Sequence, residues 1–243
     1  MAGTVKKTKQ CCKISTPLSL SVSLQDVFKF LGFEVEAYKD LNADEIKTLM
    51  IKYSKDDRHG DCFVCCVLSH GNQCGIIGKD EETCPLRDIT SPFDGDNCSL
   101  LIDKPKVFFI QACRGREMQS KVTVEADDLS GEPDQEFENV VDKYTIAGGS
   151  DFLTVMSTVD GFYSLRNSMS GSWFIQTLCK HLKDGSKQGR DILKILTDVN
   201  DDVSRKEATV RINKKIIEAK MVPEPHFTLR KTLIFRVPEG RSA

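Results

Sequence analysis

The sequence lacks any strong bias toward one class of partner. Its 243 residues carry 34 Lys and Arg against 36 Asp and Glu, which leaves a formal net charge of only −2. No segment approaches the roughly 18 consecutive apolar residues of a membrane-spanning helix. A nearly neutral chain also lacks the basic surface typical of nucleic-acid binding. We therefore expect neither a nucleic-acid partner nor a membrane partner.

Targeting signals are equally scarce. The stretch PLSLSVSL after Thr16 is too short and too rich in serine for the apolar core of a signal peptide. Position 2 is Ala2 rather than the glycine needed for myristoylation, and the C-terminus has no prenylation box. Ten cysteines are scattered without the dense spacing of a small secreted disulfide scaffold. These features predict reduced thiols in a soluble, cytoplasmic protein.

What the sequence does contain is an alternation of helical and strand patterns. Apolar residues recur with helical spacing over 24–31, 46–53, 175–182 and 192–199. Strand patterns cover 33–37, 62–68, 75–78, 107–112, 152–157 and 226–237. Several of these are short apolar runs, typical of parallel strands that are buried on both faces. The order predicts an α/β fold in which helices cover both faces of a mostly parallel sheet.

An acidic stretch interrupts this alternation. Residues 117–142 hold nine acidic side chains and one lysine, without usable periodicity. Such a composition cannot bury enough apolar surface to offset the entropy of ordering. We expect a solvated linker that is sensitive to proteases.

A thiol and an imidazole follow two of the predicted strands. Cys113 ends the run KVFFIQAC, and His70 follows the run CFVCCVLS. Because the carboxyl ends of parallel strands meet at one edge of a sheet, the two side chains should face one another across a groove there. An imidazole can activate a thiol as a nucleophile and later protonate a leaving amine. Gly71 would let a backbone N–H approach and share a developing oxyanion with the N–H of Cys113.

The segment Gln111–Gly115 reads QACRG, a signature of the caspases when a histidine lies upstream. The segments DCFVCCVLSHG, KPKVFFIQACRG, SDFL, YSLRN, GSWFIQTLC and FTLRKTLIF occur in caspase order. From about Leu24 to Val237 the chain resembles this family, above all the initiator caspases eight and ten. The resemblance implies a three-layer sandwich with about five to six strands. It also implies a cofactor-free cysteine endopeptidase that cuts proteins after aspartate in apoptotic signalling.

The resemblance assigns roles to particular residues. Cys113 would be the nucleophile, His70 the acid and base, and Gly71 an oxyanion donor. Arg166 and Gln111 would bind the substrate aspartate, whereas Tyr163 and Leu165 would line the adjacent subsite. Candidate sites of self-cleavage are Asp127, at the end of VEAD, together with Asp128 and Asp142. Arg114 is expected to serve structure rather than catalysis.

By the same resemblance the chain divides into four parts. Residues 1–23 form an atypical leader, 24–127 a large-subunit-like part, 128–142 the inter-subunit linker and 143–243 a small-subunit-like part. The leader matches neither the first strand of the family nor its second aspartate-binding arginine, whose place falls near Lys13 and Ile14. No death-effector domain is recognisable, and a homodimer or a heterodimer with another caspase is expected.

Two alternatives to an active protease remain open. The chain could be a truncated, weakly active or inactive regulator that heterodimerises with an active caspase, or a plain α/β ligand-binding domain. A zinc site at Cys62 and Cys65 is not expected, because residues i and i+3 of a strand point to opposite faces.

Overall fold

The computed structural model describes residues 18–119, 146–167, 171–212, 215–238 and 240. The candidate cleavage sites Asp127, Asp128 and Asp142, the linker 128–142 and the leader position Lys13 lie outside these residues.

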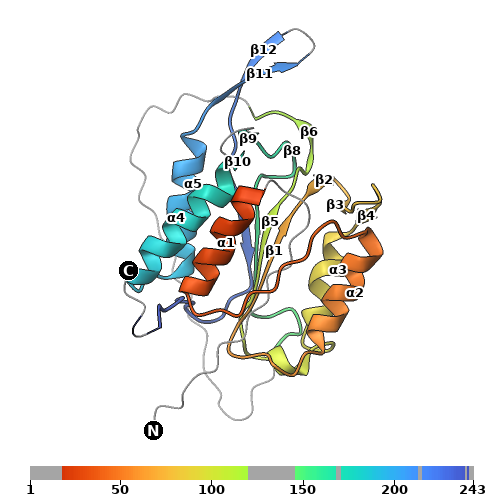
Figure 1. The fold of residues 1–243 in the computed structure, drawn as a ribbon, viewed down its shortest axis with the longest axis vertical. Helices are drawn as coiled ribbons and strands as arrows, with labels where there is room; N and C mark the ends of the chain where they lie inside the picture. Colours follow the sequence, from red (N-terminus) through yellow and green to blue (C-terminus); the bar gives the residue numbers. More distant parts are fainter. Residues whose placement is uncertain (1–17, 120–145, 168–170, 213–214, 239, 241–243) are drawn as a thin grey trace, which may run out of the picture.

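A four-stranded sheet forms the centre of the described structure (Figure 1). Its strands run in the order β1 (Phe63–Leu68), β5 (Lys106–Gln111), β7 (Phe152–Met156) and β13 (Glu224–Phe227). The first three strands are parallel, and β13 pairs with β7 in the antiparallel direction. The prediction of a mostly parallel sheet is confirmed. Within the described residues this sheet has four strands rather than the expected five or six.

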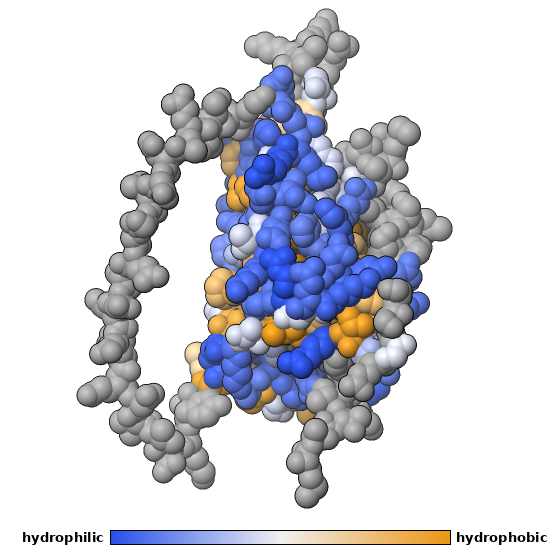
Figure 2. All heavy atoms as spheres, turned by 90° about the vertical axis from the view of Figure 1, so that its left-hand side faces the viewer, coloured by the Kyte–Doolittle hydropathy of each residue, from blue (hydrophilic) through white to orange (hydrophobic). Residues whose placement is uncertain are grey.

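Helices cover both faces of the sheet and create the expected three layers (Figure 1). α1 (Leu18–Phe30), α4 (Trp173–Lys187) and α5 (Ile192–Ser204) pack on one face, whereas α2 (Ala43–Ser54) and α3 (Leu86–Thr90) cover the other. Their apolar stripes form one core cluster with each face of the sheet. Outside, the surface over α4 and α5 is mostly hydrophilic (Figure 2).

Side chains of β1 alternate between the two core clusters. Val64, Cys66 and Leu68 belong to the cluster of α1 and α4, whereas Phe63, Cys65 and Val67 belong to that of α2. All six are at most 2% exposed. A strand that is buried on both faces needs a continuous apolar run, which explains why FVCCVL shows no polar alternation.

One predicted strand does not form, and two predicted boundaries are wrong. Residues 33–37 form no strand, because no strand among the described residues lies beside them to complete a ladder. The C-terminal strand ends at Phe227 instead of residue 237, since Arg230 beyond it is drawn to the carboxylate of Asp151. Helix α1 begins at Leu18 rather than after Ser23.

The remaining strands are short. Three of them, β2 (His70–Asn72), β3 (Gly75–Ile77) and β4 (Thr83–Cys84), form an antiparallel sheet directly after β1. Three pairs complete the set: β6 (Gly115–Glu117) with β8 (Gly161–Phe162), β9 (Arg166–Asn167) with β10 (Gly171–Ser172), and β11 (Ala208–Ile212) with β12 (Lys215–Ala219). Two 3-10 turns, η1 (Ser91–Phe93) and η2 (Ser99–Leu101), precede β5. β2 and β6 thus lie just beyond the carboxyl ends of β1 and β5.

No helix in the described part of the chain combines the length and the apolar character needed to cross a membrane.

Candidate active site

The central sheet brings His70 and Cys113 to the same edge. β1 and β5 pair in register from Phe63 with Lys106 to Leu68 with Gln111, so the residues after them leave the sheet side by side. The N–H of Ser69 still donates to the carbonyl of Gln111 at 3.0 Å, which fixes the two chain exits relative to one another.

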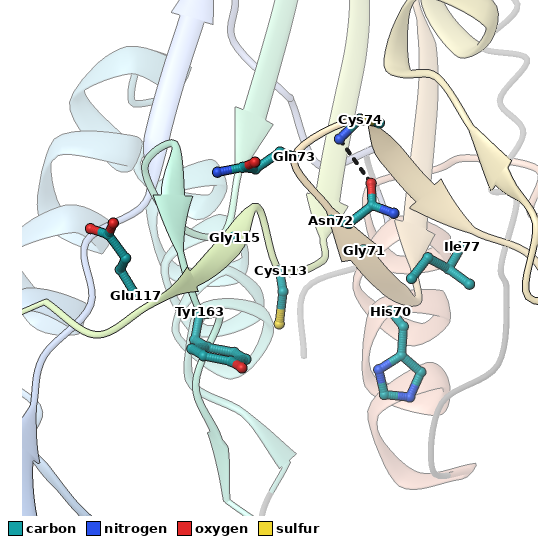
Figure 3. A pocket seen from close by; sticks show the side chains of 10 residues that line it. All are labelled: His70, Gly71, Asn72, Gln73, Cys74, Ile77, Cys113, Gly115, Glu117 and Tyr163. Atoms are coloured by element: carbon teal, nitrogen blue, oxygen red, sulfur yellow. Dashed lines mark hydrogen bonds between the residues drawn. The ribbon is translucent and has the colours of Figure 1, made fainter. Parts of the chain in front are cut away.

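A cavity of about 770 Å³ opens at this edge (Figure 3). It is lined by His70, Gly71, Asn72, Gln73, Cys74, Ile77, Cys113, Gly115, Glu117 and Tyr163. The thiol of Cys113 and the imidazole of His70 both extend into the opening (Figure 3). The predicted nucleophile and base therefore share one cavity with Gly71 and Tyr163.

The thiol of Cys113 is held by the backbone of Ser164. The N–H of Ser164 donates to Sγ at 3.4 Å, and the thiol lies 4.0 Å from the carbonyl oxygen of the same residue. Between Cys113 and His70 no hydrogen bond occurs in this structure, although both are described. Catalytic hydrogen bonds are commonly long or misaligned before substrate binds, so this geometry remains compatible with the expected pair.

Gly71 packs directly against the backbone of the nucleophile. A Cβ at this position would lie 2.5 Å from the carbonyl oxygen of Cys113 and 2.9 Å from the Cβ of Ala112. Both distances are below any real contact, so only glycine permits this approach. The backbone of Gly71 thus lies beside that of Cys113. Such proximity is required if the N–H groups of these two residues are to share one oxyanion.

Gln111 is engaged by two hydroxyl groups. Its amide nitrogen donates to Oγ of Ser164, and its amide oxygen accepts from Oγ of Ser172. The side chain is 7% exposed and does not line the cavity. To bind a substrate carboxylate, Gln111 must share or exchange these partners.

The segment that contains Ser164 also contacts a thioether. The N–H of Leu165 donates to the sulfur of Met221 at 3.1 Å, and Leu165 itself belongs to the core cluster of α1 and α4. Leu165 therefore packs inward rather than lining the described cavity, whereas its neighbour Tyr163 does line it.

Arg166 and Arg114 are the two arginines near the nucleophile that the family resemblance singles out. Arg166 lies in β9, and its side chain is outside the described part of the structure. Arg114 pairs with Glu224 on β13 and with Asp160, and it donates to the carbonyl of Thr158. These bonds tie the loop after Cys113 to the neighbouring strands, in keeping with the structural role expected for Arg114.

A second cavity of about 570 Å³ adjoins the first and shares its His70 and Ile77 walls. Its lining includes three charged residues, Asp40, Lys79 and Glu81. The sequence did not indicate that Lys79, Glu117 or Asn72 would line these cavities, because their positions depend on how a hairpin or a short strand packs. Lys79 lines this second cavity together with His70. The sequence had offered only Lys13 and its neighbours as cations near the place of the second arginine.

The cysteine pair before and within β1 points to opposite faces, as expected. Cys62 packs against the core cluster of α1 and α4, whereas Cys65 belongs to that of α2. The pair therefore cannot share a metal ion. Among the described residues no group of three His, Cys, Asp or Glu side chains is arranged to hold a metal.

Known proteins resemble this chain along most of its length. A family model described as "Caspase domain" matches residues 21–234. Caspase-8 of Mus musculus is 42% identical over 214 residues, which cover 88% of this chain and 43% of the relative. Caspase-10 of Homo sapiens is 41% identical over 162 residues, which cover 66% of this chain and 30% of the relative. The chain thus spans less than half the length of these two relatives.

The fold has a close counterpart among solved structures. The crystal structure of caspase-1 from Spodoptera frugiperda superposes with a TM-score of 0.82 and 28% sequence identity, covering 97% of this chain and 92% of that one. The family model matches residues 21–234, and this range includes the central sheet and the cavity around Cys113. The 42% identity to caspase-8 points to the same family. The chain belongs to the caspase family, a family of cysteine proteases.

Proposed function

We propose that this chain is a cysteine endopeptidase that cleaves proteins after aspartate, of the initiator type, in apoptotic signalling in the cytoplasm. The observation that carries the proposal is the shared cavity of Cys113 and His70 at the carboxyl edge of the parallel sheet. The family relationship narrows the reaction to attack of a thiol on a peptide carbonyl.

Each step has a residue to perform it. His70 takes the proton of Cys113, and Sγ bonds to the peptide carbonyl carbon as its C=O π bond opens. The resulting oxyanion would accept from the N–H groups of Gly71 and Cys113. Protonated His70 then gives its proton to the leaving amine, which departs and leaves a thioester. Water, deprotonated by His70, hydrolyses the thioester and restores the thiol.

Selectivity for aspartate requires fixed positive charge beside the cleaved bond. Arg166 is the residue proposed to bind the substrate carboxylate in bidentate fashion, with Gln111 as a neutral donor. The leader supplies no second arginine, so we expect weaker discrimination between aspartate and asparagine than two arginines would give.

A second candidate function is supported by the engagement of Gln111 with Ser164 and Ser172. If this arrangement persists, Gln111 would not bind the substrate carboxylate and the chain would be weakly active or inactive. Heterodimerisation with an active caspase is the role proposed for such a chain. Homodimerisation and heterodimerisation are both compatible with the first function. Measuring the oligomeric state of the chain by itself, and again after mixing with a catalytically competent caspase, distinguishes a homodimer from a heterodimer.

Intact-mass measurement of the expressed chain beside its Cys113→Ala variant tests the proposal. An active chain should cut itself within the acidic segment, at Asp127, Asp128 or Asp142, and the variant should remain whole. An uncut chain that also fails to hydrolyse peptides after aspartate would favour the regulatory partner.

A further inference from the structure

The turn between β2 and β3 is organised by one side chain, that of Asn72 (Figure 3). Its Oδ1 accepts from the N–H of Cys74 at 2.8 Å and from the N–H of Gly75 at 3.0 Å. A side-chain oxygen that bonds N–H groups two and three residues ahead fixes the path of a turn. Asn72 therefore determines how this hairpin closes.

The other end of the same amide reaches the third strand. Nδ2 of Asn72 donates to Oγ1 of Thr83 in β4 at 3.0 Å. β3 lies between β2 and β4 in this sheet, so the contact spans it from one edge strand to the other. One side chain thus joins the turn to β4.

Close approaches at two glycines leave this hairpin little freedom to move. On one side, Gly71 approaches the carbonyl of Cys113 so closely that a Cβ would lie 2.5 Å from it. On the other side, Gly75, with φ +155°, approaches β4, where a Cβ would lie 2.2 Å from the carbonyl oxygen of Cys84. The hairpin fits between β4 and the backbone of the nucleophile with little room on either side.

We propose that Asn72 is a positioning residue for the proposed reaction, because it holds the backbone of its neighbour Gly71 where the oxyanion forms. The inference rests on the proposed function, since it names a residue that positions one N–H donor of the proposed oxyanion site. Asn72 acts through Gly71 and Cys113 and does not itself donate to the reacting oxygen. A shift of the turn would displace the Gly71 N–H, whereas the Cys113 thiol is held from outside the hairpin by the N–H of Ser164.

The test compares Asn72→Ala with Asn72→Asp in the full chain. Alanine removes all three hydrogen bonds, whereas aspartate keeps Oδ1 as the acceptor for the turn, and its second oxygen can accept from the Thr83 hydroxyl. We expect Asn72→Ala to lower kcat about tenfold, since misplacement of a catalytic group by about 1 Å can cost up to about a hundredfold. KM should remain within about twofold, because ground-state binding does not use the oxyanion donors. Asn72→Asp should recover most of the loss.

A peptide aldehyde ending in aspartal reads the oxyanion site without turnover. Cys113 Sγ bonds to the aldehyde carbon, the C=O π bond opens, and the thiol proton ends on the oxygen as a hemithioacetal. We expect the dissociation constant of this adduct to rise about tenfold in Asn72→Ala, in parallel with kcat. Equal adduct affinity and equal kcat in both proteins would overturn the inference.

Two further variants separate positioning from general loss of structure. Thr83→Val removes only the anchor on β4 and should give an intermediate loss of kcat. Asn97→Ala removes another exposed turn amide, one that donates to the carbonyl of Ser91 at 2.9 Å, and should leave kcat unchanged. If Asn97→Ala and Asn72→Ala lower kcat equally, the effect is one of stability and the assignment to Asn72 is wrong.

If no activity is found, the NMR resonance of the Gly71 amide still tests whether Asn72 positions Gly71. When the wild-type chain neither cleaves peptides nor forms the adduct, the proposed function fails. The Gly71 amide in Asn72→Ala should still shift in the NMR spectrum and exchange faster with solvent, with recovery in Asn72→Asp. An unmoved Gly71 amide would refute the positioning role whether or not the chain is an enzyme.

Discussion

The backbone N–H of Ser164 donates to the sulfur of Cys113 at 3.4 Å, while the hydroxyl of the same serine accepts from the amide of Gln111. One residue therefore contacts both the proposed nucleophile and the proposed aspartate-binding amide. Because Gln111 is the last residue of β5, this contact also joins the strand that precedes Cys113 to the segment after β8.

Substitution Ser164→Ala separates these two contacts, since it removes the hydroxyl and keeps the N–H. The nearly buried amide of Gln111 then loses one hydrogen-bond partner, and this loss should lower the free energy of unfolding by about 1–3 kcal/mol. The same loss destabilises the free protein more than the substrate complex, so KM for aspartate peptides should fall. Urea denaturation and steady-state kinetics measure both effects. A higher KM would mean that the Gln111–Ser164 bond persists in the complex.

Gly71→Ala should disrupt the cavity, because the added Cβ would collide with the carbonyl of Cys113 and with Ala112. Overpacking of this kind typically costs about 1–3 kcal/mol of unfolding free energy, and displacing the Gly71 N–H should remove most of the activity. Gly149→Ala is the matched control, since no atom lies within 4 Å of its Cβ position. Comparable losses in both variants would show that the close approach at Gly71 is unimportant.

Arg166→Ala tests the charge in the proposed aspartate pocket. Removing the guanidinium should abolish the preference for aspartate over asparagine, since no bidentate donor would then meet the substrate carboxylate. The measurement is kcat/KM on matched aspartate and asparagine tetrapeptides. Arg87→Ala, an exposed arginine of α3, should change neither value. If selectivity survives in Arg166→Ala, another cation binds the aspartate, and Lys79, which lines the second cavity with His70, is the first to examine.

Stability should fall on mild acidification because of His59. Burial lowers the pKa of this imidazole, whose Nε2 lies 2.6 Å from the carbonyl of Tyr53. The unfolded chain takes up a proton below its ordinary pKa of about 6.5, whereas the folded chain resists it. The stabilising contribution is therefore complete above about pH 6.5 and is lost as the pH falls through the lowered folded pKa.

Chemical denaturation from pH 8 to pH 5 checks this prediction beside His59→Gln. The variant cannot titrate at this position, so its unfolding free energy should fall less between pH 6.5 and pH 5. Parallel pH profiles for the two proteins would assign the acid sensitivity to other groups.

Apolar runs allowed the central strands to be predicted, since FVCCVL and KVFFIQ can be buried on both faces only inside a sheet. The convergence of His70 and Cys113 on one cavity followed from the same reasoning. Residues 33–37 show its limit, because their alternation specifies a strand only when a neighbour exists to pair with it. A local pattern contains no information about that neighbour.

The finer geometry of the site could not be predicted for a related reason. That Ser164 would bond Cys113, or that Asn72 would reach Thr83, depends on distances between segments that are 51 and 11 residues apart. The arrangement of Leu165 shows the same effect. The family resemblance assigns it to the wall of a subsite, and the structure adds that its N–H donates to the sulfur of Met221 and that both residues belong to one core cluster.

The pairing of β5 with β7 joins two parts of the chain that lie on either side of the acidic segment. β5 lies before residue 119 and β7 after residue 146, and five residue pairs from Lys106 with Phe152 to Ile110 with Met156 join them. Phe28 and Phe109 from the first part share one core cluster with Leu153 and Phe174 from the second. We therefore expect two separately synthesised fragments, ending near Gln119 and beginning near Ile146, to reassemble by complementation.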